Sequence, residues 1–340
     1  MFIENSGNIR KSRKPTSDEL IKGIRSGDQT ALARAITLVE STRPEDRELA
    51  HLILQRTADN SRKSVRIGIT GVPGVGKSTF IEAFGGMLTA RGEKVAVLAV
   101  DPTSTLSKGS ILGDKTRMVT LVNDPNAYIR PSASGANLGG VARSTRETIA
   151  LCEAAGYGII LVETVGVGQS ETTVHGMVDF FLLLKLAGAG DELQGIKRGI
   201  MEMADSIVIN KADGENKAAA KQAMQEFRRA LHLYPPKENG WTPKVLSCSS
   251  LEKEGIEEIW QVINEYVRDT RASGSFDRKR ERQNKNWFLT ALESRLKEHF
   301  YNHPRTKKAM NELLKKVEQG VISPFQAANE LMEKVSGILK

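Results

Sequence analysis

The sequence predicts an α/β fold in which a mostly parallel sheet is flanked by helices, with further helices at both ends of the chain. Three observations support this prediction. Short apolar runs alternate with helix-like stretches between residues 65 and 247, a pattern typical of parallel strands covered on both faces. A glycine-rich segment that ends in Lys-Ser follows the first run. The segments before and after this region repeat apolar residues with helical spacing.

Composition narrows the class of protein further. The length of 340 residues corresponds to about two domains, or to one large domain with extensions. Apolar residues make up 39% and charged residues 26% of the chain, which is ordinary for a globular protein and argues against disorder or a coiled coil. With only two cysteines, Cys152 and Cys248, we expect no disulfide framework and no metal site built on thiolates. We therefore expect a cytoplasmic protein.

The net charge of +8 lies at the two ends of the chain. Basic and acidic residues number 12 and 9 in residues 1–64, 21 and 23 in residues 65–267, and 16 and 9 in residues 268–340. Basic ends can bind nucleic acid or an acidic partner. Here the basic residues alternate with glutamates, which favours a solvated helical surface. We therefore do not expect nucleic-acid binding.

Neither a targeting segment nor a membrane span is expected. The first twenty residues have no apolar core of the kind found in signal peptides. The longest apolar patch, Phe180 to Leu184, is interrupted by Lys185, and it is far shorter than the roughly 20 residues that cross a bilayer.

The first 62 residues predict a helical N-terminal extension. Thr16 and Glu19 form a capping-box pattern at the start of a first helix. A second helix is expected from Asp28 to Glu40, with its apolar residues on one face. Pro44 is suited to the first turn of a third helix that reaches about Thr57.

Residues 63–270 predict the central α/β domain. The expected strands are 65–70, 94–100, 158–163, 205–210 and 244–247. The chain turns helical again after Ile256, and Ser273 to Ser275 marks a linker. Residues 271–340 are expected to form a C-terminal helical region, with helices near 277–300, 305–318 and 324–337.

The strongest functional signal is a phosphate-binding loop. The segment from Gly71 to Ser78 matches G-x-x-x-x-G-K-[ST], and it lies between the first predicted strand and a helical run at 79–91. Its glycines let backbone N–H groups converge on phosphates, and the helix N-terminus adds the positive end of its dipole. We expect Lys77 to reach the outer phosphates and Ser78 to bind Mg²⁺. The nucleotide-binding residues predicted here are Gly71, Val72, Pro73, Gly74, Val75, Gly76, Lys77, Ser78 and Thr79.

A second motif selects the base. Asn210-Lys211-Ala212-Asp213 ends a predicted strand and resembles the N-K-x-D motif of GTP-binding proteins. In that motif the aspartate accepts hydrogen bonds from guanine N1–H and the 2-amino group, whereas adenine offers no such pair of donors and would leave the carboxylate unsatisfied. Ser247, Cys248 and Ser249 follow the next strand and resemble the loop whose backbone contacts guanine O6. We interpret Cys248 as a packed loop residue rather than a nucleophile.

Several carboxylates are candidates for Mg²⁺ binding and hydrolysis. Glu163 to Gly166 stands where GTP-binding proteins usually carry D-x-x-G, with Glu163 for the metal and the Gly166 N–H for the γ-phosphate. Asp101 and Asp114 are placed where they could meet Mg²⁺ or the attacking water, and hard oxygens suit this metal. The alternative for Asp101 is an aspartate in a turn before Pro102, and the alternative for Asp114 is a carboxylate on a surface loop. Gln169 is a further candidate for orienting water, and the residue that polarises the water stays open.

Two glycine-rich stretches, 132–140 and 188–195, are either loops that move with the nucleotide state or ordinary connectors. The five histidines show no ligand spacing with the cysteines. His299 and His303 are four residues apart, but Pro304 follows at once, and we interpret them as a surface pair.

Taken together, the motifs resemble those of the MeaB/MMAA/ArgK GTPases, the G-protein chaperones of adenosylcobalamin-dependent methylmalonyl-CoA mutase. The resemblance covers nearly the whole chain. The segments that carry it are GVPGVGKST, VDPTS, GDKTRM, ETVGVGQSE, GAGDELQGIKRGIMEMAD and NKAD.

This resemblance implies a SIMIBI-class P-loop G domain and a homodimer joined through the C-terminal helices. It implies that GTP binding and hydrolysis gate cofactor delivery to the mutase and protect or reactivate it. By motif position, Lys77, Asp101, Asp114 and Glu163 would be the phosphate, Mg²⁺ and hydrolysis residues. The stretch from Lys185 to Gly199 matches the extra switch of the family. The partner stays open, since relatives also serve other acyl-CoA mutases.

The function expected from the sequence is therefore that of a Mg²⁺-dependent GTPase that signals to an acyl-CoA mutase. One alternative is an ATP-dependent kinase of a transport binding protein, which the N-K-A-D motif disfavours. Another is a metallochaperone GTPase, which needs a His/Cys cluster that the sequence lacks. A third is a nucleic-acid-binding GTPase that uses the basic C-terminal helices.

Overall fold

The computed structural model describes residues 15–58, 64–100, 118–131, 138–164, 170–187 and 198–336. The chain forms two compact units, Met1–Asp277 and Arg278–Lys340. The first unit thus contains both the N-terminal helices and the sheet. The division into residues 1–62, 63–270 and 271–340 stays a prediction.

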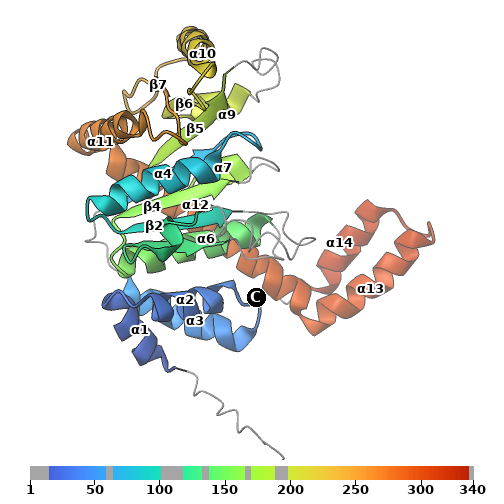
Figure 1. Cartoon of the computed structure of the whole chain (residues 1–340). Coiled ribbons are helices and arrows are strands. Elements are labelled where there is room, and N and C mark those ends of the chain that lie inside the picture. Colours follow the sequence, from blue (N-terminus) through green and yellow to red (C-terminus); the bar gives the residue numbers. More distant parts are fainter. Residues whose placement is uncertain are drawn as a thin grey trace, which may run out of the picture. The chain divides into compact units, whose positions relative to one another are not determined.

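The first unit is built on a parallel sheet whose strand order is β3-β2-β4-β1-β5-β6-β7 within the described residues (Figure 1). All neighbouring strands run parallel, so the α/β fold predicted from the sequence is confirmed. The strands are β1 (Val65–Thr70), β2 (Val95–Val100), β3 (Ala127–Arg130), β4 (Ile159–Thr164), β5 (Phe180–Leu186), β6 (Ser206–Asn210) and β7 (Lys244–Ser247).

Helices cover both faces of this sheet. On one face α4 and α11 pack on β1, β4 and β5, and on the other face lie α6, α7, α9, α10 and the N-terminal helices. The helices are α1 (Ser17–Arg25), α2 (Gln29–Glu40), α3 (Pro44–Thr57), α4 (Lys77–Ala90), α6 (Leu138–Ala154), α7 (Ser170–His175), α9 (Arg198–Met203), α10 (Asn216–Leu231) and α11 (Ile256–Ala272), with a 3₁₀ turn η1 (Leu121–Asn123).

Five of these strands match their predicted ranges to within one residue at each end, and two were not predicted. β5 contains the apolar patch from Phe180 to Leu184, which was considered above only as a possible membrane span. Its side chains are buried from Phe180 to Lys185, as expected of a central parallel strand. β3 has only four residues, and two of them are partly exposed, so its pattern was too short to stand out.

The N-terminal helices follow their predicted capping signals. The Thr16 hydroxyl accepts from the Glu19 N–H at 3.3 Å, while the Glu19 carboxylate accepts from the Thr16 N–H at 2.8 Å, which completes the capping box. Asp28 caps α2, and Pro44 occupies the first turn of α3. Their apolar faces share one core with α6 and α7.

Helix α2 also binds the edge strand β3 at both of its ends. The Gln29 amide donates to the carbonyls of Pro125 and Ala127 at 3.2 and 3.1 Å. At the other end, the guanidinium of Arg130 holds both carboxylate oxygens of Glu40, with 3.1 Å between Arg130 Nε and Glu40 Oε1. An uncovered edge strand invites pairing with other chains, and α2 supplies partners for this one.

The second unit is helical. It contains most of α12 (Ser275–Asn302), together with α13 (Pro304–Glu318) and α14 (Pro324–Lys334), and α13 packs on α14. The predicted linker is short: α11 ends at Ala272, and Gly274, with a φ of 69°, turns the chain into α12. None of the described helices is both long and apolar enough to cross a membrane.

Candidate functional site

The phosphate loop connects β1 to α4, and its geometry requires glycine at two places. A Cβ on Gly71 would lie 2.6 Å from the carbonyl oxygen of Leu184. At Gly76, φ is 93°, and a Cβ would lie 2.8 Å from the amide nitrogen of Asn210. Both positions therefore exclude side chains. The helix begins directly at Lys77, so its free N–H groups face the loop.

Lys77 is buried within this loop. Its ammonium donates to the carbonyl oxygens of Gly71 at 2.8 Å and Val72 at 3.3 Å. Burial lowers the pKa of Lys77, whereas the carboxylates of Glu163 and Glu171 act in the opposite direction. The ammonium thus rests on loop carbonyls, in a position from which it can turn to an anionic ligand.

Two of the predicted metal residues meet beside Lys77. The Ser78 hydroxyl donates to Glu163 Oε1 at 3.4 Å, and the Glu163 side chain is buried at the end of β4. A hydroxyl and a carboxylate are hard oxygen donors that suit Mg²⁺, which keeps several waters and usually binds through one or two protein groups plus substrate phosphates. Within the described residues, no group of three or more His, Cys, Asp or Glu is arranged so that it could hold a metal ion. The donor set therefore fits a metal that arrives with a phosphate ligand.

Four predicted residues fall outside the part of the chain that the structure describes. They are Asp101, Asp114, Gly166 and Gln169. Their predicted roles in Mg²⁺ binding and hydrolysis therefore stay predictions.

Asn210 joins the phosphate loop to the predicted guanine loop. Its amide donates to the carbonyl oxygen of Val75 at 2.9 Å, and its oxygen accepts from the hydroxyl of Ser250 at 2.7 Å. The following residue, Lys211, has a left-handed backbone with a φ of 59°, which is uncommon outside glycine. The first residue of the N-K-A-D motif therefore contacts both loops from the end of β6.

Asp213 is oriented by a serine. The hydroxyl of Ser249, itself buried, donates to Asp213 Oδ2 at 2.6 Å. Among the described residues, no hydrogen bond is made to Asp213 Oδ1, which leaves one oxygen and part of the other for a ligand. The sequence predicted a backbone contact from this loop and missed that the Ser249 side chain holds the carboxylate.

Cys248 is packed in the same loop. Its thiol lies 3.4 Å from Asn210 Oδ1, and its side chain is buried. Burial raises the pKa of the Cys248 thiol to about 12. Because the thiolate is the nucleophilic form, this residue is unsuited to nucleophilic catalysis.

Sequence reasoning missed Glu171 as well. This carboxylate lies in the first turn of α7, is buried, and contributes to the electrostatic environment of Lys77. The available signal was its place at the end of ETVGVGQSE, eight residues after Glu163. The buried Thr70–Thr164 hydroxyl pair was also missed.

The described site residues gather at the carboxyl edge of the sheet. The phosphate loop follows β1, Glu163 belongs to the end of β4, Asn210 ends β6, and Ser249 follows β7. Ligands of open α/β sheets bind outside this edge. Direct contacts link the loops in pairs, through Ser78 to Glu163, Asn210 to Val75, and Ser249 to Asp213.

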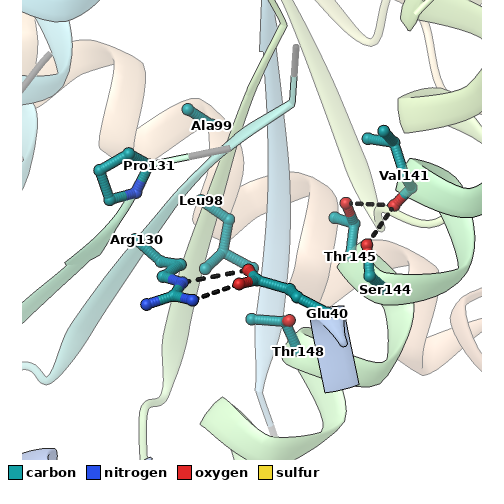
Figure 2. A pocket seen from close by; sticks show the side chains of 9 residues that line it. All are labelled: Glu40, Leu98, Ala99, Arg130, Pro131, Val141, Ser144, Thr145 and Thr148. Atoms are coloured by element: carbon teal, nitrogen blue, oxygen red, sulfur yellow. Dashed lines mark hydrogen bonds and ion pairs between the residues drawn. The ribbon is translucent and has the colours of Figure 1, made fainter. Parts of the chain in front are cut away.

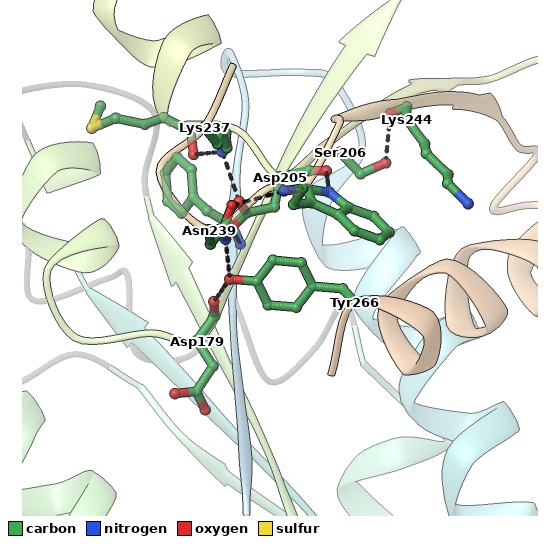
Figure 3. Close-up of polar contacts among 10 residues, drawn as sticks. Asp179, Asp205, Ser206, Lys237, Asn239, Lys244 and Tyr266 are labelled. Carbon is green, nitrogen blue, oxygen red and sulfur yellow. Dashed lines mark hydrogen bonds and ion pairs between the residues drawn. The ribbon is translucent and has the colours of Figure 1, made fainter. Parts of the chain in front are cut away.

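The opposite edge of the sheet holds a separate polar network (Figure 3). Asp205 Oδ2 accepts from the Phe181 N–H at 2.9 Å, and its Oδ1 pairs with Lys237 at 2.6 Å. Tyr266 donates its hydroxyl to the carbonyl oxygen of Asp179 at 3.0 Å. Because these buried carboxylates precede strands and hold backbone groups, the network stabilises the fold far from the phosphate loop.

A small pocket opens beside the ends of β2 and β3 (Figure 2). The Arg130–Glu40 ion pair forms one wall, and the hydroxyls of Ser144 and Thr145 both donate to the carbonyl oxygen of Val141 on another. The pocket has room for about one or two water-sized groups. Within the described part of the chain, none of the predicted site residues lines it. Its lining residues are Glu40, Leu98, Ala99, Arg130, Pro131, Val141, Ser144, Thr145 and Thr148.

Comparisons with known proteins identify relatives of this chain. A family model described as methylmalonyl Co-A mutase-associated GTPase MeaB matches residues 32–305. A probable GTPase of Mycobacterium tuberculosis is 50% identical over 94% of this chain and 95% of its own length. A Mus musculus protein named methylmalonic aciduria type A homolog, mitochondrial, is 48% identical over 93% of this chain and 79% of its own length.

A solved structure is similar over nearly the whole chain. The crystal structure of an LAO/AO transport system kinase has a TM-score of 0.73 and 39% identity, and the match covers 95% of this chain and 99% of that one. The residues matched by the family model include both the phosphate loop and the loop from Ser247 to Ser249.

Proposed function

The chain belongs to the family of methylmalonyl-CoA mutase-associated GTPases, it is a GTPase, and we propose that it acts as a nucleotide-dependent chaperone of an adenosylcobalamin-dependent acyl-CoA mutase. In this proposal GTP binding and hydrolysis gate cofactor delivery to the mutase and protect or reactivate it. Methylmalonyl-CoA mutase is the proposed partner, on the strength of the family description and the name of the mouse relative.

The observation that carries the guanine assignment is the contact between Ser249 and Asp213. A carboxylate fixed by a serine hydroxyl at 2.6 Å is oriented to accept two hydrogen bonds from a guanine edge. Adenine has no matching donors, so its binding would leave the carboxylate desolvated and unsatisfied. Asn210 connects this loop to the phosphate loop, which relates recognition of the base to the position of the phosphates.

At the phosphate end we assign binding to the loop from Gly71 to Thr79. Lys77 exchanges its two loop carbonyls for phosphate oxygens, and Ser78 and Glu163 would hold Mg²⁺. When bound, the metal neutralises negative charge on the phosphates. By their place in the sequence motifs, Asp101, Asp114, Gly166 and Gln169 are proposed to complete the site.

Catalysis in this proposal depends on positioning and electrostatics, because phosphoryl transfer to water needs little covalent help from the protein. Lys77 places a positive charge beside the phosphates, and the α4 N-terminus directs backbone N–H groups toward them. From the family resemblance, we expect slow intrinsic hydrolysis that the partner accelerates.

We also propose a homodimer formed through the C-terminal helices. The family resemblance implies it, and the described part of the second unit exposes a row of large apolar side chains on α12 at helical spacing. Such a face is costly in water unless a partner covers it. The residues are Phe288, Leu289, Leu292 and Leu296.

The test of this function is complex formation with purified methylmalonyl-CoA mutase. We expect the two proteins to co-elute from a gel-filtration column in the presence of GDP or a non-hydrolysable GTP analogue. The mutase should also raise the rate of GTP hydrolysis. Absence of both effects would contradict the chaperone role and leave the GTPase assignment intact.

One alternative is an ATP-dependent kinase, since the solved relative is described as a transport system kinase. That description applies to the relative. The paired Ser249 and Asp213 disfavour adenine in this chain. Competition between ATP and GTP for the site separates the two functions, and the kinase role requires ATP to displace GTP at equal concentration.

A further inference from the structure

Two threonine hydroxyls form a buried hydrogen bond between the carboxyl ends of β1 and β4. Thr164 Oγ1 donates to Thr70 Oγ1 at 2.9 Å, and the two residues are 0% and 1% exposed. Thr70 is the last residue of β1, directly before the phosphate loop, and Thr164 is the last residue of β4, directly after Glu163. The bond therefore connects the two strand ends that deliver the phosphate loop and the proposed metal carboxylate.

This bond links β1 and β4 beyond the last residues that pair in the sheet. The registered pairs of β1 and β4 run from Val65 with Ile159 to Ile69 with Glu163. Thr70 and Thr164 come one residue later in each strand. Past the last registered pair, the hydroxyl bond joins the two strands.

The threonines and Glu163 lie on opposite faces of the sheet, because side chains alternate along a strand. Thr70 shares its face with Gly68, where an added Cβ would lie 2.8 Å from Phe181 of β5 and 3.1 Å from Val174 of α7. Glu163 shares the other face with Ile69, toward α4, and there it meets Ser78 at 3.4 Å. The hydroxyl pair thus holds the backbone of β4 from behind while Glu163 faces the phosphate loop.

Fold stability alone does not require hydroxyls here. Buried parallel strands usually carry Val, Ile or Leu, and replacing two hydrogen-bonded polar groups by apolar groups of the same shape is nearly neutral. Valine has the shape of threonine. The fixed bond length between two hydroxyls, in contrast, sets the distance between the strand ends.

We propose that the Thr70–Thr164 hydrogen bond is a positioning contact for GTP hydrolysis, which keeps the end of β4, and with it Glu163, in register with Ser78. This inference depends on the proposed role of Ser78 and Glu163 in holding Mg²⁺. The threonines touch neither the nucleotide nor the metal in this account, and they act through the carboxylate.

The test compares Thr164→Val, Thr164→Ser, Thr70→Val and the double valine variant of the full-length protein. We expect kcat for GTP to fall about tenfold in Thr164→Val, the lower end of the losses seen when groups that orient metal ligands are removed, while KM stays within about twofold. The serine variant keeps the hydroxyl and should recover at least half of kcat. The double variant should lose no more than the single ones, because neither hydroxyl is left unpaired.

A second readout does not depend on turnover. The affinity for a fluorescent GDP analogue is measured with Mg²⁺ and with EDTA. In Thr164→Val the affinity in EDTA should match that of the unaltered protein. The factor by which Mg²⁺ increases the affinity should fall about tenfold, because removing groups that orient metal ligands weakens metal binding by about this much. If Thr164→Val unfolds below the assay temperature, Thr70→Val breaks the same bond from the other strand.

Thr270→Val is the matched control. The Thr270 hydroxyl is buried and donates to the carbonyl oxygen of Tyr266 at 2.6 Å, within α11. Loss of this hydroxyl should lower Tm about as much as Thr164→Val does. It should leave unchanged both kcat and the increase in GDP affinity that Mg²⁺ produces. The proposal is overturned if Thr164→Val keeps both quantities, or if Thr270→Val loses them equally. An unaltered protein that hydrolyses no GTP would instead refute the function on which the proposal rests.

Discussion

In the proposed function, Asp213 and Ser249 would select the purine that the site accepts. The serine hydroxyl fixes one carboxylate oxygen at 2.6 Å, and the arrangement favours a ligand edge with two adjacent donors. Replacing Asp213 by asparagine exchanges an acceptor for a donor at this point, so the change tests the base assignment with almost no change in shape.

We predict that Asp213→Asn weakens GTP binding by about 10²-fold or more, as expected when buried polar groups lose their partners, and favours xanthosine triphosphate. Xanthine has a carbonyl where guanine has its 2-amino group, and the new amide can donate to it. The measurement is the competition of both nucleotides for the site. Glu226→Gln, on the exposed part of α10, should change neither affinity. Unchanged GTP binding in Asp213→Asn would show that this carboxylate does not read the base.

Many residues of the candidate site could be predicted from the sequence, because they belong to contiguous motifs. The glycines of the phosphate loop and the N-K-A-D segment are each read from one stretch of chain. The contacts of Ser249 with Asp213 and of Thr70 with Thr164 join residues 36 and 94 positions apart. Such contacts depend on strand order and register, which a local pattern does not contain.

At the scale of elements, the sheet was predictable wherever a strand is both buried and bounded by turn signals. β1 and β4 satisfy both conditions. β5 is equally apolar, but a buried lysine, Lys185, interrupts its pattern. β3 is four residues long and lies at the edge, where half of its residues are partly exposed. Its helical cover, α2, was predicted without any indication of what it covers.

The pairing of α2 with β3 yields a prediction about stability. Arg130 and Glu40 are 25% and 15% exposed and form a bidentate ion pair. Glu40→Ala leaves the guanidinium partly buried without this carboxylate, so we expect the free energy of unfolding to fall by about 1–3 kcal/mol, measured by urea denaturation.

The matched control is Asp18→Ala, which breaks the pair of Asp18 with Arg56 in the same helical extension. These side chains are 73% and 49% exposed, and exposed pairs contribute about 0–1 kcal/mol. Equal losses in the two variants would contradict the view that the Arg130–Glu40 pair secures α2 on the edge strand.

At the scale of the whole molecule, the proposed dimer would bury the exposed apolar side chains of α12. We predict that replacing Phe288 and Leu292 by aspartate converts the protein from dimer to monomer, because two charges would be buried in the interface. Light scattering coupled to gel filtration measures the mass. Basal GTP hydrolysis should persist, since the described site residues all belong to the first unit.

Leu233→Asp is the control for this change, since Leu233 is 82% exposed in the first unit, after α10. It should leave the mass unaltered. A monomeric mass of the unaltered protein at micromolar concentration would contradict the proposed dimer.

The most direct test of the central claim is calorimetric titration of the purified protein with nucleotides in the presence of Mg²⁺. The account predicts that GDP and a non-hydrolysable GTP analogue each bind at one site per chain. It also predicts at least 10²-fold weaker binding of ATP, because the carboxylate of Asp213 finds no donors on adenine. Equal affinity for ATP and the GTP analogue, or no heat with any guanine nucleotide, would contradict it.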